Sequence, residues 1–253
     1  MTIQEERQDV ATLTGPMRTY FLRPTAPGKY PAIILYSEIF QVTGPIRRTA
    51  AFLAGHGFVV AVPEIYHEFL EAGTVLEYDA EGGARGNDLK TAKGLAAYDS
   101  DARALLDALS TRNDCTGKLG VAGICSGGHL AFRAACNADV LAAVCFYATD
   151  LHKPEWGEAV NDSLDHISEI KAEMMMVWGR QDPHIPREGR QKVYDAMNDA
   201  NLLLTWHEFN GAHAFLRDEG PRYNPALAKI CYEMALELFE RKLGEGDKEK
   251  DGG

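Results

Sequence analysis

The 253-residue sequence lacks any apolar run long enough to span a bilayer, and its first seven residues are mostly polar. A membrane-spanning helix needs about 20 consecutive apolar residues, and a secretory signal needs an apolar segment near the N-terminus. Basic residues are also scarce, since 26 Lys and Arg stand against 37 Asp and Glu and leave a formal net charge of −11. We therefore expect neither membrane nor nucleic-acid binding, because anionic membranes and nucleic acids attract basic surfaces.

Cysteine is sparse and irregularly spaced. The chain has five cysteines, an odd number, and several of them lie inside apolar runs. Disulfide frameworks and zinc sites use paired or regularly spaced cysteines. We therefore expect free thiols in a cytoplasmic protein, with no metal and no organic cofactor.

Apolar, β-rich runs alternate along the chain with amphipathic, Ala-rich runs. The apolar runs at 32–36 and 174–178 are continuous, which is typical of strands buried on both faces of a parallel sheet. We predict a single α/β domain over residues 1–243, with a mostly parallel central sheet of about seven to eight strands flanked by helices. The predicted strands are 17–23, 32–37, 58–63, 118–123, 141–147, 174–179 and 203–209, and the predicted helices are 45–54, 90–109, 126–136, 187–200 and 225–243.

Two segments fall outside this alternation. Residues 66–87 form a long stretch rich in Glu and Gly, on the side of the sheet where parallel folds carry their sites. This stretch is either a partial lid over the site or a disordered surface loop. Residues 244–253 carry no apolar side chain, and we predict a disordered polar tail there.

The stretch from Gly123 to Gly128 reads Gly-Ile-Cys-Ser-Gly-Gly and lies between an apolar strand and an Ala-rich helix. It matches the Gly-x-nucleophile-x-Gly turn of α/β hydrolases, with Cys125 in the central position. That turn strains its central residue and crowds the residues two before and two after it, and glycine relieves the crowding. With Ser126 central, the crowded position would fall on Ile124, so we favour Cys125 as the nucleophile.

Two other interpretations of the same stretch stay open. The first is a structural role for Cys125, since free cysteine is among the most buried residue types. The second is a phosphate site at the start of a helix. Neither G-x-G-x-x-G nor G-x-x-x-x-G-K-[ST] occurs here, which weighs against phosphate binding.

A thiol nucleophile needs a base, and the base needs a residue that orients it. In α/β hydrolases both follow the nucleophile along the chain, the acid first. Asp182 follows the predicted strand 174–179, and His213 follows 203–209, so both fall at the same edge of the sheet. An Asp before Pro is also a common turn residue, and a loop His is commonly a surface residue. Asp150, after the preceding strand, is the alternative acid.

The combination resembles the dienelactone hydrolases (carboxymethylenebutenolidases), cysteine-dependent members of the α/β-hydrolase fold. The likeness runs from about Tyr20 to Leu243. A Cys at the turn together with Glu-Ile-Phe after an early strand makes it specific. The segments that carry it are 36–40, 123–128, 178–186 and 211–217.

The resemblance implies a role for each matching residue. Cys125, His213 and Asp182 would form a catalytic triad. Glu38 would help to form the thiolate when substrate arrives; taken alone, it is an acid at a strand end. The N–H groups of Ile39 and Ser126 would form the oxyanion hole.

The resemblance also implies substrate-binding residues. Arg217 would pair with a substrate carboxylate, with a solvated loop cation as the alternative. Tyr147 would line the pocket, with core packing as the alternative. The family's second substrate-binding arginine has no clear counterpart, and Arg85 is the candidate for it.

These expectations describe an enzyme that hydrolyses small esters or lactones through a covalent acyl-enzyme. A thioesterase or acyltransferase would share the same triad, and a small-molecule sensor with weak turnover would share the same scaffold. We expect a small-molecule substrate and a chain that is a monomer or a homodimer.

Overall fold

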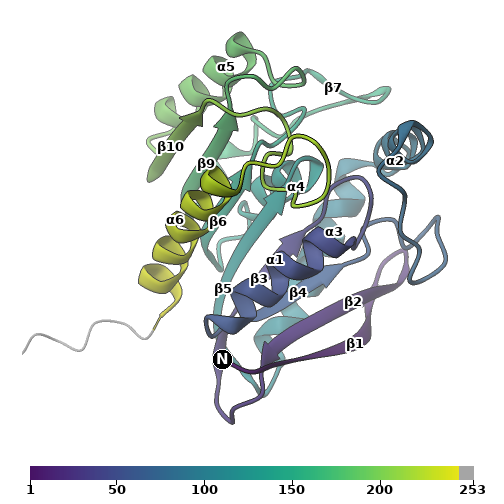
Figure 1. The fold of residues 1–253 in the computed structure, drawn as a ribbon, viewed down its shortest axis with the longest axis vertical. Helices are drawn as coiled ribbons and strands as arrows, with labels where there is room; N and C mark the ends of the chain where they lie inside the picture. Colours follow the sequence, from purple (N-terminus) through teal and green to yellow (C-terminus); the bar gives the residue numbers. More distant parts are fainter. Residues whose placement is uncertain (245–253) are drawn as a thin grey trace, which may run out of the picture.

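The architecture rests on one eight-stranded sheet, with the strand order β1-β2-β4-β3-β5-β6-β9-β10 (Figure 1). The structure is a computed structural model, and it describes residues 1–244. A separate hairpin pairs β7 with β8. The strands are β1 Ile3–Thr12, β2 Gly15–Pro24, β3 Tyr30–Tyr36, β4 Val59–Pro63, β5 Cys115–Ile124, β6 Val140–Phe146, β7 Glu155–Trp156, β8 Ala159–Val160, β9 Glu173–Gly179 and β10 Leu204–Phe209.

The sheet is parallel from β4 to β10 and antiparallel only where β2 pairs with β1 and β4. The predicted mostly parallel sheet of seven to eight strands is confirmed, and each predicted strand has its counterpart. The sequence did not predict β1. This edge strand buries only Val10, because its side chains are largely polar and exposed, so it lacks the apolar pattern that marks the inner strands.

Helices cover both faces of the sheet. Helices α1 and α6 lie in front of it in Figure 1, and α3 and α4 pack together behind it. The chain therefore forms a three-layer α/β sandwich with its core on both sides of the sheet. The helices are α1 Gly44–Gly55, α2 Ala80–Ala92, α3 Leu95–Thr111, α4 Ser126–Ala134, α5 Arg187–Asp199 and α6 Pro225–Leu243, with a short 3₁₀ turn at Ile167–Glu169.

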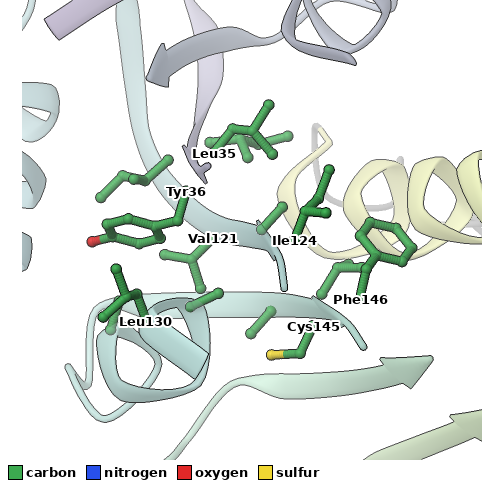
Figure 2. Packing of buried hydrophobic residues seen from close by; sticks show 14 of the residues in the cluster. Leu35, Tyr36, Val121, Ile124, Leu130, Cys145 and Phe146 are labelled. Atoms are coloured by element: carbon green, nitrogen blue, oxygen red, sulfur yellow. The ribbon is translucent and has the colours of Figure 1, made fainter. Parts of the chain in front are cut away.

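Side chains of the inner strands point alternately to the two faces of the sheet, and so pack against the helices on both sides. Val121 and Tyr36 lie on the side of Leu130 in α4, whereas Ile124 and Phe146 lie toward α6 (Figure 2). All five side chains are at most 4% exposed. Strands with apolar residues on both faces have no solvent-facing side, which explains their continuous apolar sequence.

The prediction of one helix over 90–109 was wrong, because two helices meet there. Helix α2 ends before Lys93, whose backbone is extended, and α3 begins after Gly94. The Lys93 ammonium is buried, contacts the Asp101 carboxylate, and lies 2.7 Å from a carboxylate oxygen of Glu68. A buried ammonium must be paired, and the break in the helix lets it reach both acids.

The segment 66–87 has a defined conformation, so of the two alternatives for it the disordered surface loop does not fit. Residues from Ala80 onward form the first turns of α2, and the buried Tyr66 hydroxyl donates to the carbonyl oxygen of Gly86. The predicted tail, 244–253, lies outside the described residues apart from Gly244. Within residues 1–244, no helix combines the length and the apolar character that crossing a membrane requires.

Candidate active site

The structure has a sharp turn between β5 and α4, with Cys125 at its centre. Cys125 has φ 62° and ψ −121°, a backbone conformation that costs energy for a residue with a side chain. A Cβ atom on Gly123 would lie 1.8 Å from the carbonyl oxygen of Gly127. A Cβ atom on Gly127 would lie 2.4 Å from the carbonyl oxygens of Tyr36 and Ser37. Only glycine fits at either place, which is the crowding that the sequence pattern predicts.

The structure brings Cys125, His213 and Asp182 into one hydrogen-bonded chain. Nε2 of His213 lies 3.2 Å from Sγ of Cys125, and Nδ1 lies 2.6 Å from Oδ2 of Asp182. The N–H of His184 donates to the other Asp182 oxygen at 2.8 Å. A carboxylate only accepts, so Nδ1 carries a proton and Nε2 is the nitrogen that exchanges a proton with the sulfur.

The electrostatics of this chain favour a charged imidazole. Burial lowers the pKa of His213, but the interactions with the Cys125 sulfur and the Asp182 carboxylate together outweigh burial and raise that pKa to about 10. All three residues are at most 9% exposed, so water screens their charges weakly. These charges therefore favour the protonated, cationic form of the His213 ring.

Two residues near Cys125, Ser126 and Ile39, have backbone N–H groups without a protein acceptor within residues 1–244. Ser126 is the first residue of α4, and Ile39 follows β3. The Ser126 hydroxyl is buried without a hydrogen-bond partner, whereas the Cys125 sulfur is hydrogen-bonded to His213. The positive end of α4 and these free donors favour negative charge beside Cys125.

Glu38 lies in the cleft wall with its carboxylate almost fully buried. Arg217 lies 3.8 Å from one of its oxygens, and the Tyr78 hydroxyl donates to the other at 3.2 Å. Burial raises the pKa of Glu38, and the charges of Arg217 and His213 only partly offset that effect. Arg217 is itself fixed, because its guanidinium lies 4.1 Å from the centre of the Tyr78 ring.

A cleft of about 350 Å³ opens directly above Cys125 and His213. Glu38, Ile39 and Arg217 also line it. One wall comes from the end of the 66–87 segment and from α2. The partial-lid alternative for that segment fits this position, since the segment borders the cleft on one side.

Two predicted substrate-binding residues lie elsewhere. Tyr147 is fully buried and packs its ring 5.0 Å from that of His213, and it does not line the cleft; this placement fits the core-packing alternative. Arg85 is exposed and does not line the cleft either. Positions 83, 87 and 90 of α2 face the cleft and 82, 86 and 89 are buried, so the 3.6-residue period turns position 85 outward.

Asp150, the alternative acid, does not reach His213. Its oxygens lie 2.5 Å from Nζ of Lys90 and 2.7 Å from Nζ of Lys153. Burial raises the pKa of Asp150, but the two ammonium groups have the larger, opposite effect. The pKa of Asp150 therefore falls to about 2. Asp150 is therefore ionised and bound to lysines, while Asp182 accepts from His213.

Several residues of the cleft were missed by sequence reasoning. Tyr78, Lys90, Lys153 and Arg222 all line it. His184 does too, with its ring 4.8 Å from that of His213. The length and composition of the 66–87 segment were the only sequence features that pointed to these residues. Single charged residues on loops and helix faces do not form a recognisable motif.

A parallel sheet of this order, with a strained Cys at the turn after β5 and an acid and a His after β9 and β10, defines an α/β hydrolase. A sequence model of the dienelactone hydrolase family matches residues 17–243. The chain belongs to the dienelactone hydrolase family.

Individual relatives agree with this assignment. A Saccharomyces cerevisiae protein, provisionally named a carboxymethylenebutenolidase, is 39% identical over 96% of this chain and 93% of its own. The Pseudomonas putida carboxymethylenebutenolidase is 29% identical over 85% of this chain and 88% of its own. A crystal structure from Klebsiella pneumoniae, provisionally named a dienelactone hydrolase, has a TM-score of 0.83 at 22% identity and covers 95% of this chain and 100% of its own. At that identity, the likeness to the crystal structure concerns the fold.

Proposed function

We propose that this protein is a cysteine-dependent hydrolase of small esters or lactones, with Cys125, His213 and Asp182 as its triad. The observation that carries the proposal is the hydrogen-bonded chain from Asp182 through His213 to Cys125, which ends at the floor of the cleft. The thiolate form of Cys125 is the nucleophile, and an adjacent imidazolium stabilises that form.

Acylation begins when the Cys125 thiolate attacks the substrate carbonyl carbon. A C–S bond forms, and the carbonyl electrons move to oxygen, where the N–H groups of Ile39 and Ser126 stabilise the negative charge. The C–O bond then breaks, and the leaving oxygen takes the proton from Nε2 of His213. The products are a thioester on Cys125, a neutral imidazole and a free hydroxyl group, which in a lactone stays attached to the acyl chain.

Deacylation uses the neutral imidazole as a base. Nε2 of His213 takes a proton from water, and the resulting hydroxide adds to the thioester carbonyl. The C–S bond breaks, the carboxylic acid leaves, and the thiolate–imidazolium pair is restored. Asp182 keeps Nε2 facing the sulfur throughout, since its hydrogen bond fixes the ring orientation and the tautomer.

Substrate selection follows from the charges beside Cys125. Arg217 offers its guanidinium 3.8 Å from Glu38, so a substrate carboxylate competes with Glu38 for it. Burial raises the pKa of Glu38, whereas the charge of Arg217 lowers it, so loss of Arg217 as a partner makes the Glu38 carboxylate a stronger base. Glu38 thus becomes a proton acceptor when an acidic substrate binds, which is the activating role predicted for it.

A trapping experiment tests the proposal. Purified protein is mixed with phenyl acetate or a small lactone, quenched with acid within the first turnovers, and digested for mass spectrometry. We expect hydrolysis together with an acyl adduct on Cys125. Cys136, which is partly exposed and lies outside the cleft, is the internal control and should stay unmodified. Turnover without an adduct on Cys125, or an adduct on Ser126, would contradict the triad.

Two further predictions remain as proposals. The free cysteines are the feature that supports a cytoplasmic location. A monomer or homodimer is the expected oligomeric state, and size-exclusion chromatography with light scattering measures it directly.

A further inference from the structure

A second charged cluster lies in the same cleft. Asp150 is bound between the ammonium groups of Lys90 and Lys153, at 2.5 Å and 2.7 Å. The side chains of Lys90 and Asp150 are only 12% and 10% exposed. Two cations share one anion, so the Lys90–Asp150–Lys153 cluster carries a net positive charge inside a chain whose formal net charge is −11.

The cluster is held in place at an energetic cost. Asp150 has φ +66°, in the left-handed region that is unfavourable for residues with a side chain. Its carbonyl oxygen accepts from the Asn161 side-chain amide at 2.8 Å and from the Lys153 N–H at 3.0 Å. Lys90 also lies 5.2 Å from the centre of the Trp156 ring. Such strain persists only where the surroundings fix it, and it is common at ligand sites.

Sheet order places this cluster across the nucleophile from Arg217. Strand β5, which ends at Cys125, lies between β3 and β6. Glu38 follows β3 and contacts Arg217, whereas Asp150 follows β6 and binds Lys90 and Lys153. The cleft therefore has a positive group on each side of the reactive sulfur.

The donors of the cluster are not used up by Asp150. The Lys90 ammonium has three N–H groups. Within residues 1–244 it makes a single hydrogen bond, to Asp150. Lys153 is half-exposed and likewise pairs only with Asp150 in the described part of the chain. Both ammonium groups thus have N–H donors left for an anion that enters the cleft.

We propose that the Lys90–Asp150–Lys153 cluster is a second anion subsite, and that the preferred substrate is an ester or lactone with a carboxylate on each side of the scissile carbonyl. This inference rests on the proposed function. Arg217 receives one carboxylate and the lysines receive the other, while Asp150 sets the positions of the two ammonium groups. Glu38 and Asp150 keep each subsite from attracting anions too strongly for product to leave.

Four substrates separate the two subsites. Phenyl acetate is neutral, 4-acetoxybenzoate carries a carboxylate on the leaving group, and monophenyl glutarate carries one on the acyl group. The mono-(4-carboxyphenyl) ester of glutaric acid carries both. We expect wild-type kcat/KM to be highest for the doubly charged ester and lowest for phenyl acetate.

Variants then assign each carboxylate to its subsite. Lys90→Gln should raise KM about tenfold for the doubly charged ester and for one of the singly charged esters, since a charged hydrogen bond is lost. Arg217→Ala should do the same for the other singly charged ester. Lys90→Arg should restore most of the affinity, and Lys229→Gln, on the exposed surface of α6, should change nothing. If Lys90→Gln and Lys153→Gln leave all four KM values unchanged, or raise all four equally, the subsite does not exist.

A binding test is independent of turnover. Glutarate and butyrate differ by one carboxylate, and each can be tested for protection of Cys125 against alkylation by iodoacetamide. In the wild type glutarate should protect at lower concentration than butyrate, and Lys90→Gln should abolish the difference. Equal protection by the two acids overturns the inference. Protection by glutarate without hydrolysis of any of the four esters would instead leave the subsite in place and contradict the proposed function.

Discussion

Gly86 of α2 lies so close to Ile39 that a Cβ atom at position 86 would sit 2.5 Å from the Ile39 carbonyl oxygen. The helix that walls the cleft therefore packs directly on the residue whose N–H is the proposed oxyanion donor. The position of that donor depends on the absence of a side chain across from it.

Gly86→Ala should therefore reduce catalysis more than binding. The added methyl group displaces α2 or Ile39, and a displaced donor no longer stabilises the oxyanion. We expect kcat to fall by roughly tenfold or more, since loss of one such donor costs about 100- to 1000-fold, with a smaller change in KM. Gly55→Ala is the matched control, because a Cβ there meets nothing within 4 Å. Equal effects of the two substitutions on kcat would show that α2 does not position the oxyanion donor.

Cys125→Ala should abolish turnover, whereas Ser126→Ala should keep most of it. The strained backbone and the contact with His213 belong to Cys125, and the Ser126 hydroxyl is buried with no partner. Steady-state rates with an aryl ester measure both variants. An inactive Ser126→Ala beside an active Cys125→Ala would reverse the assignment of the nucleophile.

Asp182→Asn should lower kcat by several orders of magnitude, with little loss of stability. The amide can donate to Nδ1, which then loses its proton and leaves Nε2 protonated, the wrong tautomer for accepting a proton from water. The pKa of His213 should also fall, because the carboxylate contributes to its rise to about 10. Nuclear magnetic resonance of the His213 ring against pH measures this shift. A wild-type rate with an unchanged titration would remove Asp182 from the triad.

His129 should make the fold sensitive to acid. This residue is fully buried in α4, and burial lowers its pKa to about 3. Unfolded, a His titrates at about 6.5, so between these two values the unfolded chain binds a proton that the folded chain excludes. Stability contributed by neutral His129 is thus complete above the unfolded pKa and is lost as pH falls from about 6.5 toward 3.

Denaturant unfolding at several pH values tests this dependence. In His129→Gln the loss of stability between those limits should be smaller by up to about 1.4 kcal/mol per pH unit. The comparison of slopes with wild type cancels the titration of the carboxylates that both proteins share. His56→Gln, at an exposed position, should keep the wild-type slope. A slope in His129→Gln equal to that of wild type would mean that His129 is not the group responsible.

The sheet could be predicted from the sequence because buried strand positions are occupied by apolar residues. The run Met174–Trp178 is apolar because β9 is covered on both faces, and Gly123 and Gly127 mark the turn because no other residue fits. In both cases the constraint acts on a few consecutive residues, so it appears in a short stretch of sequence.

The rest depended on contacts between distant residues. The break after α2 lets Lys93 pair with Glu68 and Asp101. Helix propensity along the sequence does not reveal such a pairing between distant residues. Lys90 and Asp150 are 60 residues apart and meet only in the folded chain. Arg85 was chosen for its charge, but its direction was set by the pitch of a helix whose start was not predicted.

Helix α2 buries little surface, and this affects how the cleft can vary between related proteins. Its buried positions are Gly82, Gly86 and Leu89, so it contributes a single apolar side chain to the interior. Elements with so little buried surface open before the rest of the structure, and its amides should exchange with deuterium sooner than those of β3 and β5. Because α2 contributes so little buried apolar surface, substitutions on the cleft-facing side of this helix should accumulate without unfolding the protein. The wall that distinguishes one substrate from another is thus also the part of the site that is freest to evolve.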